Sequence, residues 1–193
     1  MFFFSRPSQS QIRQFLHEAA KQHFSYDCVG ASRELQRPDG FVVDHNRQLL
    51  GNGKETFDRA MAAIESWTMF AMPWIELVHD TPPREGMVVC VRASHLGFYS
   101  LNACKVVYCL NETVASKTIY GFAYGTLNEH AESGEERFCV EWDEKDDSVH
   151  YDLFAFSKPG SLLTKLAYPL ARSYQRRFAA GSKLAMLEAC SQR

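Results

Sequence analysis

The densest group of ionisable side chains in the sequence lies in YGTLNEHAESGEERF, the segment from Tyr124 to Phe138. It holds one histidine, four glutamates, a tyrosine and an arginine. Histidine titrates near neutral pH and a nearby carboxylate tunes it, so His130 and Glu132 are suited to general acid–base catalysis. The same residue types could hold a zinc or iron ion. Three interpretations follow: a catalytic loop, a metal site, or a polar turn between two strands.

The spacing within this segment favours the polar turn. Its glutamates follow no established metal-ligand spacing, and an acidic stretch interrupted by glycine is typical of a solvated turn. The sequence contains no G-x-S-x-G nucleophile motif, no G-x-G-x-x-G and no phosphate-binding loop. We therefore expect no metal and no cofactor. Binding groups often lie on loops carried by a rigid scaffold, so Tyr124, His130 and Glu132 are candidates for ligand contact at a cavity rim.

Asp44 and His45 form a second candidate pair, in which the carboxylate could tune the imidazole. Adjacent residues of a strand point to opposite faces, so the two cannot simply cooperate, and a structural histidine is the favoured interpretation. Tyr26 is a further polar candidate, and Trp67 flanks a predicted helix. The candidate ligand-binding residues are therefore Tyr26, His45, Trp67, Tyr124, His130 and Glu132.

Two short helices are predicted in the first third of the chain. In SQSQIRQFLHEAAKQ, residues 8–22, apolar side chains recur at helical spacing behind a serine suited to an N-cap. In KETFDRAMAAIESW, residues 54–67, Phe57, Met61 and Ile64 recur about one turn apart. Between them, turn signals at PDG and GNG bound one expected strand near Phe41 to Leu49.

From Trp74 onward the apolar period changes to two. Five or six consecutive segments alternate in this way, with short links, which predicts an antiparallel meander. In RFCVEW the alternation sends Phe138, Val140 and Trp142 to one face, so one face of the sheet requires a cover.

The expected cover is a C-terminal helix from Ser161 to about Leu187, kinked at Pro169. Its apolar stripe comprises Leu163, Leu166, Ala167, Leu170, Tyr174 and Phe178. The helix also carries five basic side chains, which a solvated outer face explains better than binding to anionic lipid or RNA. Two helices, a meander and a covering helix predict the α+β class, with a pocket between sheet and helix.

Composition bounds the remaining possibilities. The chain has 193 residues, a length at which one domain over 1–193 is the default. With 21 basic and 23 acidic side chains there is no positive field to recruit nucleic acid. The apolar start MFFF is too short for a signal peptide, and no segment reads as transmembrane, so we expect a cytoplasmic protein. The six cysteines form no C-x-x-C pair and are expected to be reduced thiols. The sequence specifies no oligomeric state.

Three stretches together resemble a known family. FSYDCVGASRE, PDGFVVDHNRQLLGNGKETFDRAMAAIESW and YGTLNEHAESGEERF, in this order, resemble a domain-of-unknown-function family grouped with the START-like, helix-grip (SRPBCC) superfamily. The resemblance covers about residues 24–190 and implies a curved antiparallel sheet around a long C-terminal helix, with a hydrophobic cavity beneath it. The chain departs from the family pattern at Asn128, where proline is usual, and at Ser32, where threonine is common.

The wider superfamily includes lipid and hormone carriers, polyketide cyclases and aromatic-ring enzymes, so the fold does not choose between carrying and catalysing. The favoured hypothesis is the binding of a small, largely apolar ligand between sheet and C-terminal helix. The alternative is a cavity-based enzyme, a cyclase, lyase or hydrolase, that uses His45, His130 and a glutamate for proton transfer. A third possibility is an interaction protein that meets a partner through its apolar surface or basic helix. Candidate walls of the cavity are Phe122, Tyr124, Phe138, Trp142, Tyr151 and Phe154.

Overall fold

The computed structural model describes residues 1–78, 82–95, 97–128, 130, 132–160 and 168–191. Its secondary structure consists of strands, two 3-10 turns (η) and α-helices. In chain order these elements are β1 Phe2–Phe3, α1 Gln9–Ala19, η1 Ala31–Glu34, β2 Val42–Asn52, α2 Lys54–Glu65, η2 Thr68–Phe70, β3 Ile75–Val78, β4 Val88–Ser94, β5 Tyr99–Val114, β6 Lys117–Thr126, β7 Glu132–Asp143, β8 Ser148–Pro159 and α4 Tyr168–Ser191.

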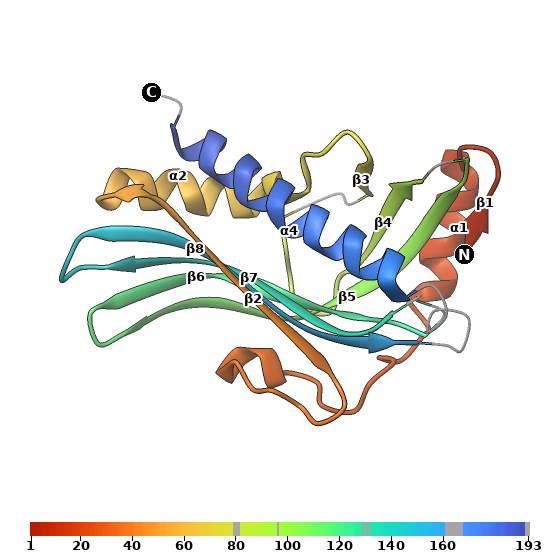
Figure 1. Ribbon diagram of the computed structural model, residues 1–193, viewed down its shortest axis with the longest axis horizontal. Helices are drawn as coiled ribbons and strands as arrows, with labels where there is room; N and C mark the ends of the chain where they lie inside the picture. The colour runs from red at the N-terminus through yellow and green to blue at the C-terminus, as the bar shows by residue number, and fades with distance from the viewer. Residues whose placement is uncertain (79–81, 96, 129, 131, 161–167, 192–193) are drawn as a thin grey trace.

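The strands form one antiparallel sheet in the order β2-β8-β7-β6-β5-β4-β3, with β1 paired to β5. Strands β3 to β8 are neighbours in chain order, as the predicted meander requires, and β2 joins the edge beside β8. The sheet is curved, and α4 crosses its concave side together with α2 (Figure 1). This α+β arrangement, a curved sheet around a long C-terminal helix, confirms the predicted helix-grip class.

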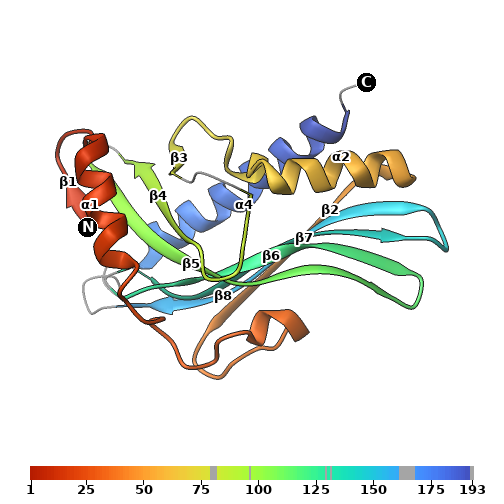
Figure 2. The same cartoon turned by 180° about the vertical axis from the view of Figure 1, so that it is seen from behind.

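The opposite, convex side of the sheet is covered by the chain that leads into β2. This orange segment, which includes η1, lies across the sheet from α2 and α4 in both views (Figures 1 and 2). Tyr26 and Ala31 from this segment are buried against Phe154 and Phe156 of β8. The sheet therefore has two buried surfaces, and the alternation of side chains along each strand assigns a residue to one or the other.

The main core lies between the concave side of the sheet, α2 and α4. Trp67, Phe70, Phe122 and Phe138 are buried there, and the rings of Trp67 and Phe122 meet edge to face with centroids 4.6 Å apart. Each such aromatic side chain contributes about 2–3 kcal/mol by leaving water. Met186 of α4 belongs to the same cluster, so the last turns of the helix are held mainly by apolar packing.

The first helix has the cap that its sequence predicts. The Ser8 hydroxyl accepts a hydrogen bond from the Gln11 backbone, and the Gln11 side chain accepts one from the Ser8 backbone. This capping box satisfies two amides of the first turn. The buried face, with Ile12 and Phe15, packs beside β4 and β5.

The C-terminal helix is described from Tyr168 to Ser191, so the predicted kink at Pro169 stands at the edge of the described residues. Leu170, expected in the buried stripe, is 57% exposed. Tyr174 and Phe178 lie on the sheet side, as expected. The expected positions Leu163, Lys165, Leu166 and Ala167 lie outside the described residues.

The segment expected as a turn is mostly strand. β6 ends at Thr126 and β7 already begins at Glu132. Ser133 and Gly134 pair with Lys158 and Ser157 of β8, so ladder hydrogen bonds outweigh the local preference for a turn. The faces of RFCVEW are as predicted, with Phe138 and Val140 in the core.

All six cysteines are free, as expected, and four are buried, whereas Cys109 is exposed. Within the described part of the chain no helix has the length and apolarity needed to cross a membrane.

Candidate functional site

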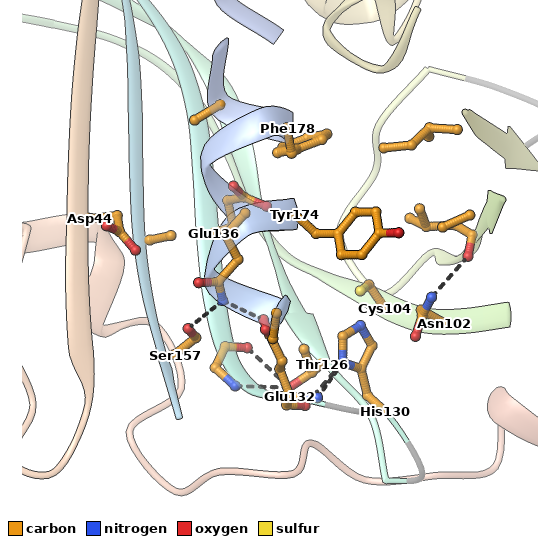
Figure 3. Close-up of a pocket in the computed structure, with 18 of the residues that line it drawn as sticks. Asp44, Asn102, Cys104, Thr126, His130, Glu132, Glu136, Ser157, Tyr174 and Phe178 are labelled. Carbon is orange, nitrogen blue, oxygen red and sulfur yellow. Dashed lines mark hydrogen bonds between the residues drawn. The ribbon is translucent and has the colours of Figure 1, made fainter. Parts of the chain in front are cut away.

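A pocket of about 390 Å³ lies between α4 and the concave side of the sheet (Figure 3). Side chains from β2, β4, β5, β6, β7 and β8 form its floor, while η2, the segment after it and α4 close it above. Such a position, between a curved sheet and a helix, is where concave binding sites usually occur.

Aromatic side chains form the apolar wall of the pocket. Phe70 of η2 lies 5.3 Å from Phe178 of α4 and 6.1 Å from Tyr124 of β6, measured between ring centroids. Trp74 and Tyr174 are 5.7 Å apart. Leu153 and Ala155 of β8, Val91 and Ala93 of β4, and Ile75 of β3 complete this wall.

Glu136 places a carboxyl group inside this apolar space. The Tyr124 hydroxyl donates a hydrogen bond to its Oε2 over 2.9 Å. Burial raises the pKa of Glu136 to about 8, and the negative charges of Glu132 and Asp44 raise it further, against the opposing effect of the Tyr124 hydrogen bond. At neutral pH the carboxyl is therefore mostly protonated and able to donate.

Glu132, four residues earlier on β7, lies at the end of the same pocket. Gln175 of α4 donates from Nε2 to its carboxylate over 2.7 Å and to the Ser157 hydroxyl over 3.0 Å. Burial raises the pKa of Glu132 as well, while the Gln175 hydrogen bond and the Arg172 charge lower it. Helix and floor are thus joined by a polar contact beside the cavity.

His130 borders the pocket from the connection between β6 and β7. The Glu132 backbone N–H donates to its Nδ1 over 3.0 Å. Burial lowers the pKa of His130 to about 4, so the ring is neutral at physiological pH. Nδ1 also lies 3.0 Å from the Glu132 carbonyl oxygen, so the tautomer of the neutral ring decides whether Nδ1 accepts from the N–H or donates to the carbonyl.

Asp44 of β2 joins the start of α4 to the opposite edge of the pocket. Both guanidinium terminal nitrogens of Arg172 donate to its carboxylate, Nη2 to Oδ1 over 2.7 Å. Asp44 and His45 do point to opposite faces, as predicted, because Asp44 meets α4 while His45 lies on the convex side.

Three of the candidate residues line this pocket, namely Tyr124, His130 and Glu132, and three do not. Trp67 is buried in the core beside Phe122. Its backbone has φ 57° at the end of α2, and its indole fills the space behind the pocket wall. From the sequence, a large aromatic residue such as Trp67 at the end of a helix can be expected to be buried. The sequence does not tell which cavity its ring borders.

Tyr26 lies on the convex side and binds Glu135. Its hydroxyl donates over 2.7 Å to Oε2, which also accepts from the Gly30 N–H over 2.8 Å. The Ser32 N–H and hydroxyl donate to Oε1. Glu135 thus fastens the segment before β2 onto the sheet. Gly125 is required beneath Tyr26, because a Cβ there would lie 2.0 Å from the tyrosine oxygen.

His45 also lies on the convex side, within a charged network. Its Nε2 is 2.7 Å from Oδ2 of Asp152, a residue only 1% exposed. Arg137 donates to Oδ1 of Asp152 over 3.0 Å, and Arg47 donates to Glu141 over 2.7 Å. The buried carboxylates are therefore paired, and His45 has the structural role that its position favoured.

The family described as a domain of unknown function, DUF1990, matches residues 25–184. This chain belongs to the DUF1990 family. The resemblance to a family of unknown function is thereby confirmed, over nearly the predicted range.

Three relatives of the DUF1990 chain carry the name UPF0548 protein. The one from Dictyostelium discoideum is 31% identical and the alignment covers 98% of this chain and 95% of the relative. The Arabidopsis thaliana relative is 30% identical, with 95% and 94% covered, and the Deinococcus radiodurans relative is 33% identical, with 92% of each covered.

Two solved structures are similar at low identity. Ara h 8.0201 is 12% identical, with 77% of this chain and 99% of that chain covered and a TM-score of 0.44. A hypothetical protein from Helicobacter pylori is 15% identical, with 79% and 86% covered and a TM-score of 0.47.

Several pocket residues of the DUF1990 chain were not selected from the sequence. Glu136, a polar candidate in the ionisable segment but not one of the predicted ligand-binding residues, shares the face of Phe138 by strand alternation. Tyr174 lies in the predicted helical stripe. His95, whose Nε2 is 2.9 Å from the Ser100 hydroxyl, and Gln175 enter the site only through tertiary packing, for which the sequence carries no local signal.

The geometry of the DUF1990 pocket supports recognition and proton transfer. No group of three metal-ligating side chains suited to an ion occurs among the residues that the structure describes. The polar groups of the pocket instead comprise a protonated carboxyl, a neutral imidazole, and amide and hydroxyl groups, which can bind a polar head while the aromatic wall holds an apolar body.

Proposed function

We propose that this protein binds a small, largely apolar ligand in the pocket between the sheet and α4. The observation that carries the proposal is the pocket itself, about 390 Å³ in volume, with an aromatic wall and a few convergent polar groups. A packed core leaves few voids larger than a water molecule, so a hollow of this size with polar groups in one region is characteristic of a binding site.

Native mass spectrometry of the purified protein tests the proposal directly. We expect a bound mass that is released on denaturation. The matched pair Ala179→Trp and Ala180→Trp provides the control, because Ala179 lines the pocket while Ala180 is exposed on the same helix. A179W should fill the cavity and lose the bound mass, whereas A180W should retain it. Absence of any bound mass, or equal retention in both variants, contradicts the proposal.

Acid–base catalysis in the same pocket is the second candidate, and the contact between Tyr124 and Glu136 favours it. A carboxyl whose pKa lies near the working pH, here raised to about 8 by burial, transfers protons effectively. The pocket residues suited to this chemistry are His130, Glu132 and Glu136, whereas His45, predicted to take part, lies on the convex side beside Asp152. Incubation of the protein with its released ligand in heavy water tests the idea. Deuterium incorporation that Glu136→Gln abolishes supports catalysis, and no incorporation contradicts it.

A further inference from the structure

We propose that the ligand of this pocket carries a protonated amine, for which Glu136 is the counter-ion. The inference rests on the proposed binding function and specifies the chemical class of the ligand. Its basis is the placement of carboxylates, cations and aromatic faces around the cavity.

The charges that line the pocket are predominantly negative. Asp44, Glu132 and Glu136 border it, and the Asp44 carboxylate is occupied by Arg172. Of the lining residues that the structure describes, Arg176 is the one lysine or arginine, and it is exposed to solvent. Within the described ranges neither Glu132 nor Glu136 forms an ion pair. Among the described residues, the cavity therefore contains carboxyl groups with no lysine or arginine at ion-pair distance, although the Arg172 charge acts on Glu132.

None of the described groups next to Glu136 brings a positive charge to its carboxyl group. Tyr124 of β6 donates to it, and Cys104 of β5 and Tyr151 of β8 lie close to it as neutral groups. Glu132 of β7 and Asp44 of β2 add negative potential. From α4, Arg172 is bound to Asp44, Gln175 is bound to Glu132, and Arg176 extends to solvent.

A protonated amine fits these surroundings better than the alternatives. A ligand carboxylate would meet like charges, which disfavours it in a desolvated cavity. A neutral carbonyl could accept from the protonated Glu136, but its oxygen would face the negative potential of Glu132 and Asp44. An ammonium group gains from the carboxyl groups of Glu136 and Glu132, in a pocket that the aromatic rings of Tyr124 and Phe70 line.

The proton balance of binding follows from this pairing. The ammonium ion R–NH₃⁺ enters, the Glu136 carboxylic acid becomes a carboxylate, and its proton passes to solvent. No covalent bond to the ligand forms or breaks. Binding of an amine is therefore coupled to proton release below about pH 8, since burial raises the pKa of Glu136 to about 8.

Isothermal titration with a matched set of naphthalene compounds tests the inference. The probes are 1-naphthylmethylamine, 1-naphthylmethanol and 1-naphthoate, which share one aromatic body and differ in the polar group. We expect the amine to bind at least about tenfold more tightly than the alcohol, and naphthoate to bind weakest. Titration in phosphate and in Tris at pH 7 should show proton release for the amine alone. Amine affinity should rise from pH 6 to pH 8.5.

Glu136→Gln should abolish both the preference for the amine and the proton release, while leaving alcohol affinity within about twofold, which also reports that the pocket is folded. Glu144→Gln, in the exposed turn after β7, is the control and should behave as the wild type. If the alcohol binds as tightly as the amine, or if amine affinity falls with rising pH, the inference is wrong while the proposed binding function stands. If no probe binds, both are contradicted.

Discussion

Glu135 and Glu136 are neighbours in sequence, yet they perform unrelated tasks. Glu135 is 3% exposed on the convex side, where two hydroxyls and two backbone amides donate to its carboxylate. Glu136 points into the pocket and receives one hydrogen bond, from Tyr124. Strand alternation separates the two residues by the full thickness of the sheet. Glu135 holds the segment before β2 on the sheet, whereas the burial of Glu136 in the pocket costs free energy and fits the proposed binding role.

Replacing Glu136 by Gln should change how stability depends on pH. The folded-state pKa, raised by burial to about 8, exceeds the unfolded value near 4.5, so the folded protein binds more protons between these limits. The stability due to this group is fully present below about pH 4.5 and is lost as pH rises through 8. E136Q should therefore melt at a higher temperature than wild type at pH 8.5–9, as measured by calorimetry. Equal melting temperatures at pH 9 would contradict the assignment.

His130 should make stability depend on pH in the opposite direction. Burial lowers its folded-state pKa to about 4, below its usual value of 6.5, so its contribution is complete above about pH 6.5 and is lost as pH falls through 4. We expect His130→Asn to flatten the loss of stability between pH 6.5 and 4, measured by urea unfolding at a series of pH values. A variant curve parallel to that of the wild type over this range would show that His130 is not buried neutral.

Removing the Glu135 charge should destabilise the protein at every pH near neutrality. Glu135→Ala leaves the donors of Tyr26, Gly30 and Ser32 without their acceptor, at a cost of about 3 kcal/mol. Tyr26→Phe removes one donor and should cost about 1 kcal/mol. Chemical denaturation measures both losses in the free energy of unfolding. Glu112→Ala, which breaks an exposed pair with Arg33, is the control and should stay within about 0.5 kcal/mol of wild type. A loss for E135A no larger than for E112A would contradict the anchoring role.

At the scale of elements, α4 is held in two ways. Its later turns carry Met186 and Cys190 into the core, whereas its first turns meet the sheet through Arg172 and Gln175. Apolar packing is rigid, while polar contacts at a partly exposed site are weaker. We therefore expect the first described turns of α4, above the pocket, to open at a lower free energy than its later turns.

Asp44→Ala tests this division of α4. Loss of the pair with Arg172 should cost about 1–2 kcal/mol and increase amide exchange in residues 168–178, with little change in 182–190. Hydrogen–deuterium exchange with mass spectrometry measures both segments at once. Asp58→Ala, which removes an exposed pair with Lys54, should leave both segments unchanged. Uniform acceleration along α4 would show that the helix opens as one unit.

Periodicity was sufficient to predict most elements, because strand and helix patterns persist over many residues. The capped first helix and the inward face of Phe138, Val140 and Trp142 follow from local spacing alone. The site was harder to predict. In the sequence, His45 and Glu132 are both candidates for ligand contact and proton transfer. The pairing of β2 with β8, however, directs His45 toward Asp152 on the convex side. Position across a sheet depends on contacts between residues a hundred apart, which no local pattern specifies.

At the scale of the whole molecule, α4 covers a large part of the concave side, beside α2. The core cluster includes Met186 and Cys190 together with Phe122 and Phe138 of the sheet. A chain ending at residue 160 should lose cooperative thermal unfolding and bind the dye ANS strongly, because its aromatic floor faces water. A chain ending at Ser191 is the control. Sharp, dye-free unfolding of the shorter chain would show that the sheet does not depend on α4.

The two-sided character of β7 also limits how the length of the chain can change. One residue inserted or deleted between Glu135 and Asp143 would exchange the contents of the two faces: Arg137 would turn toward the aromatic core and Phe138 toward Asp152. The turn between β7 and β8, around Glu144 to Asp147, sets no such alternation and is exposed. Tolerance to changes in length should therefore end abruptly where the ladder begins, and natural variants of this fold should differ in length at the turn and not along the strand.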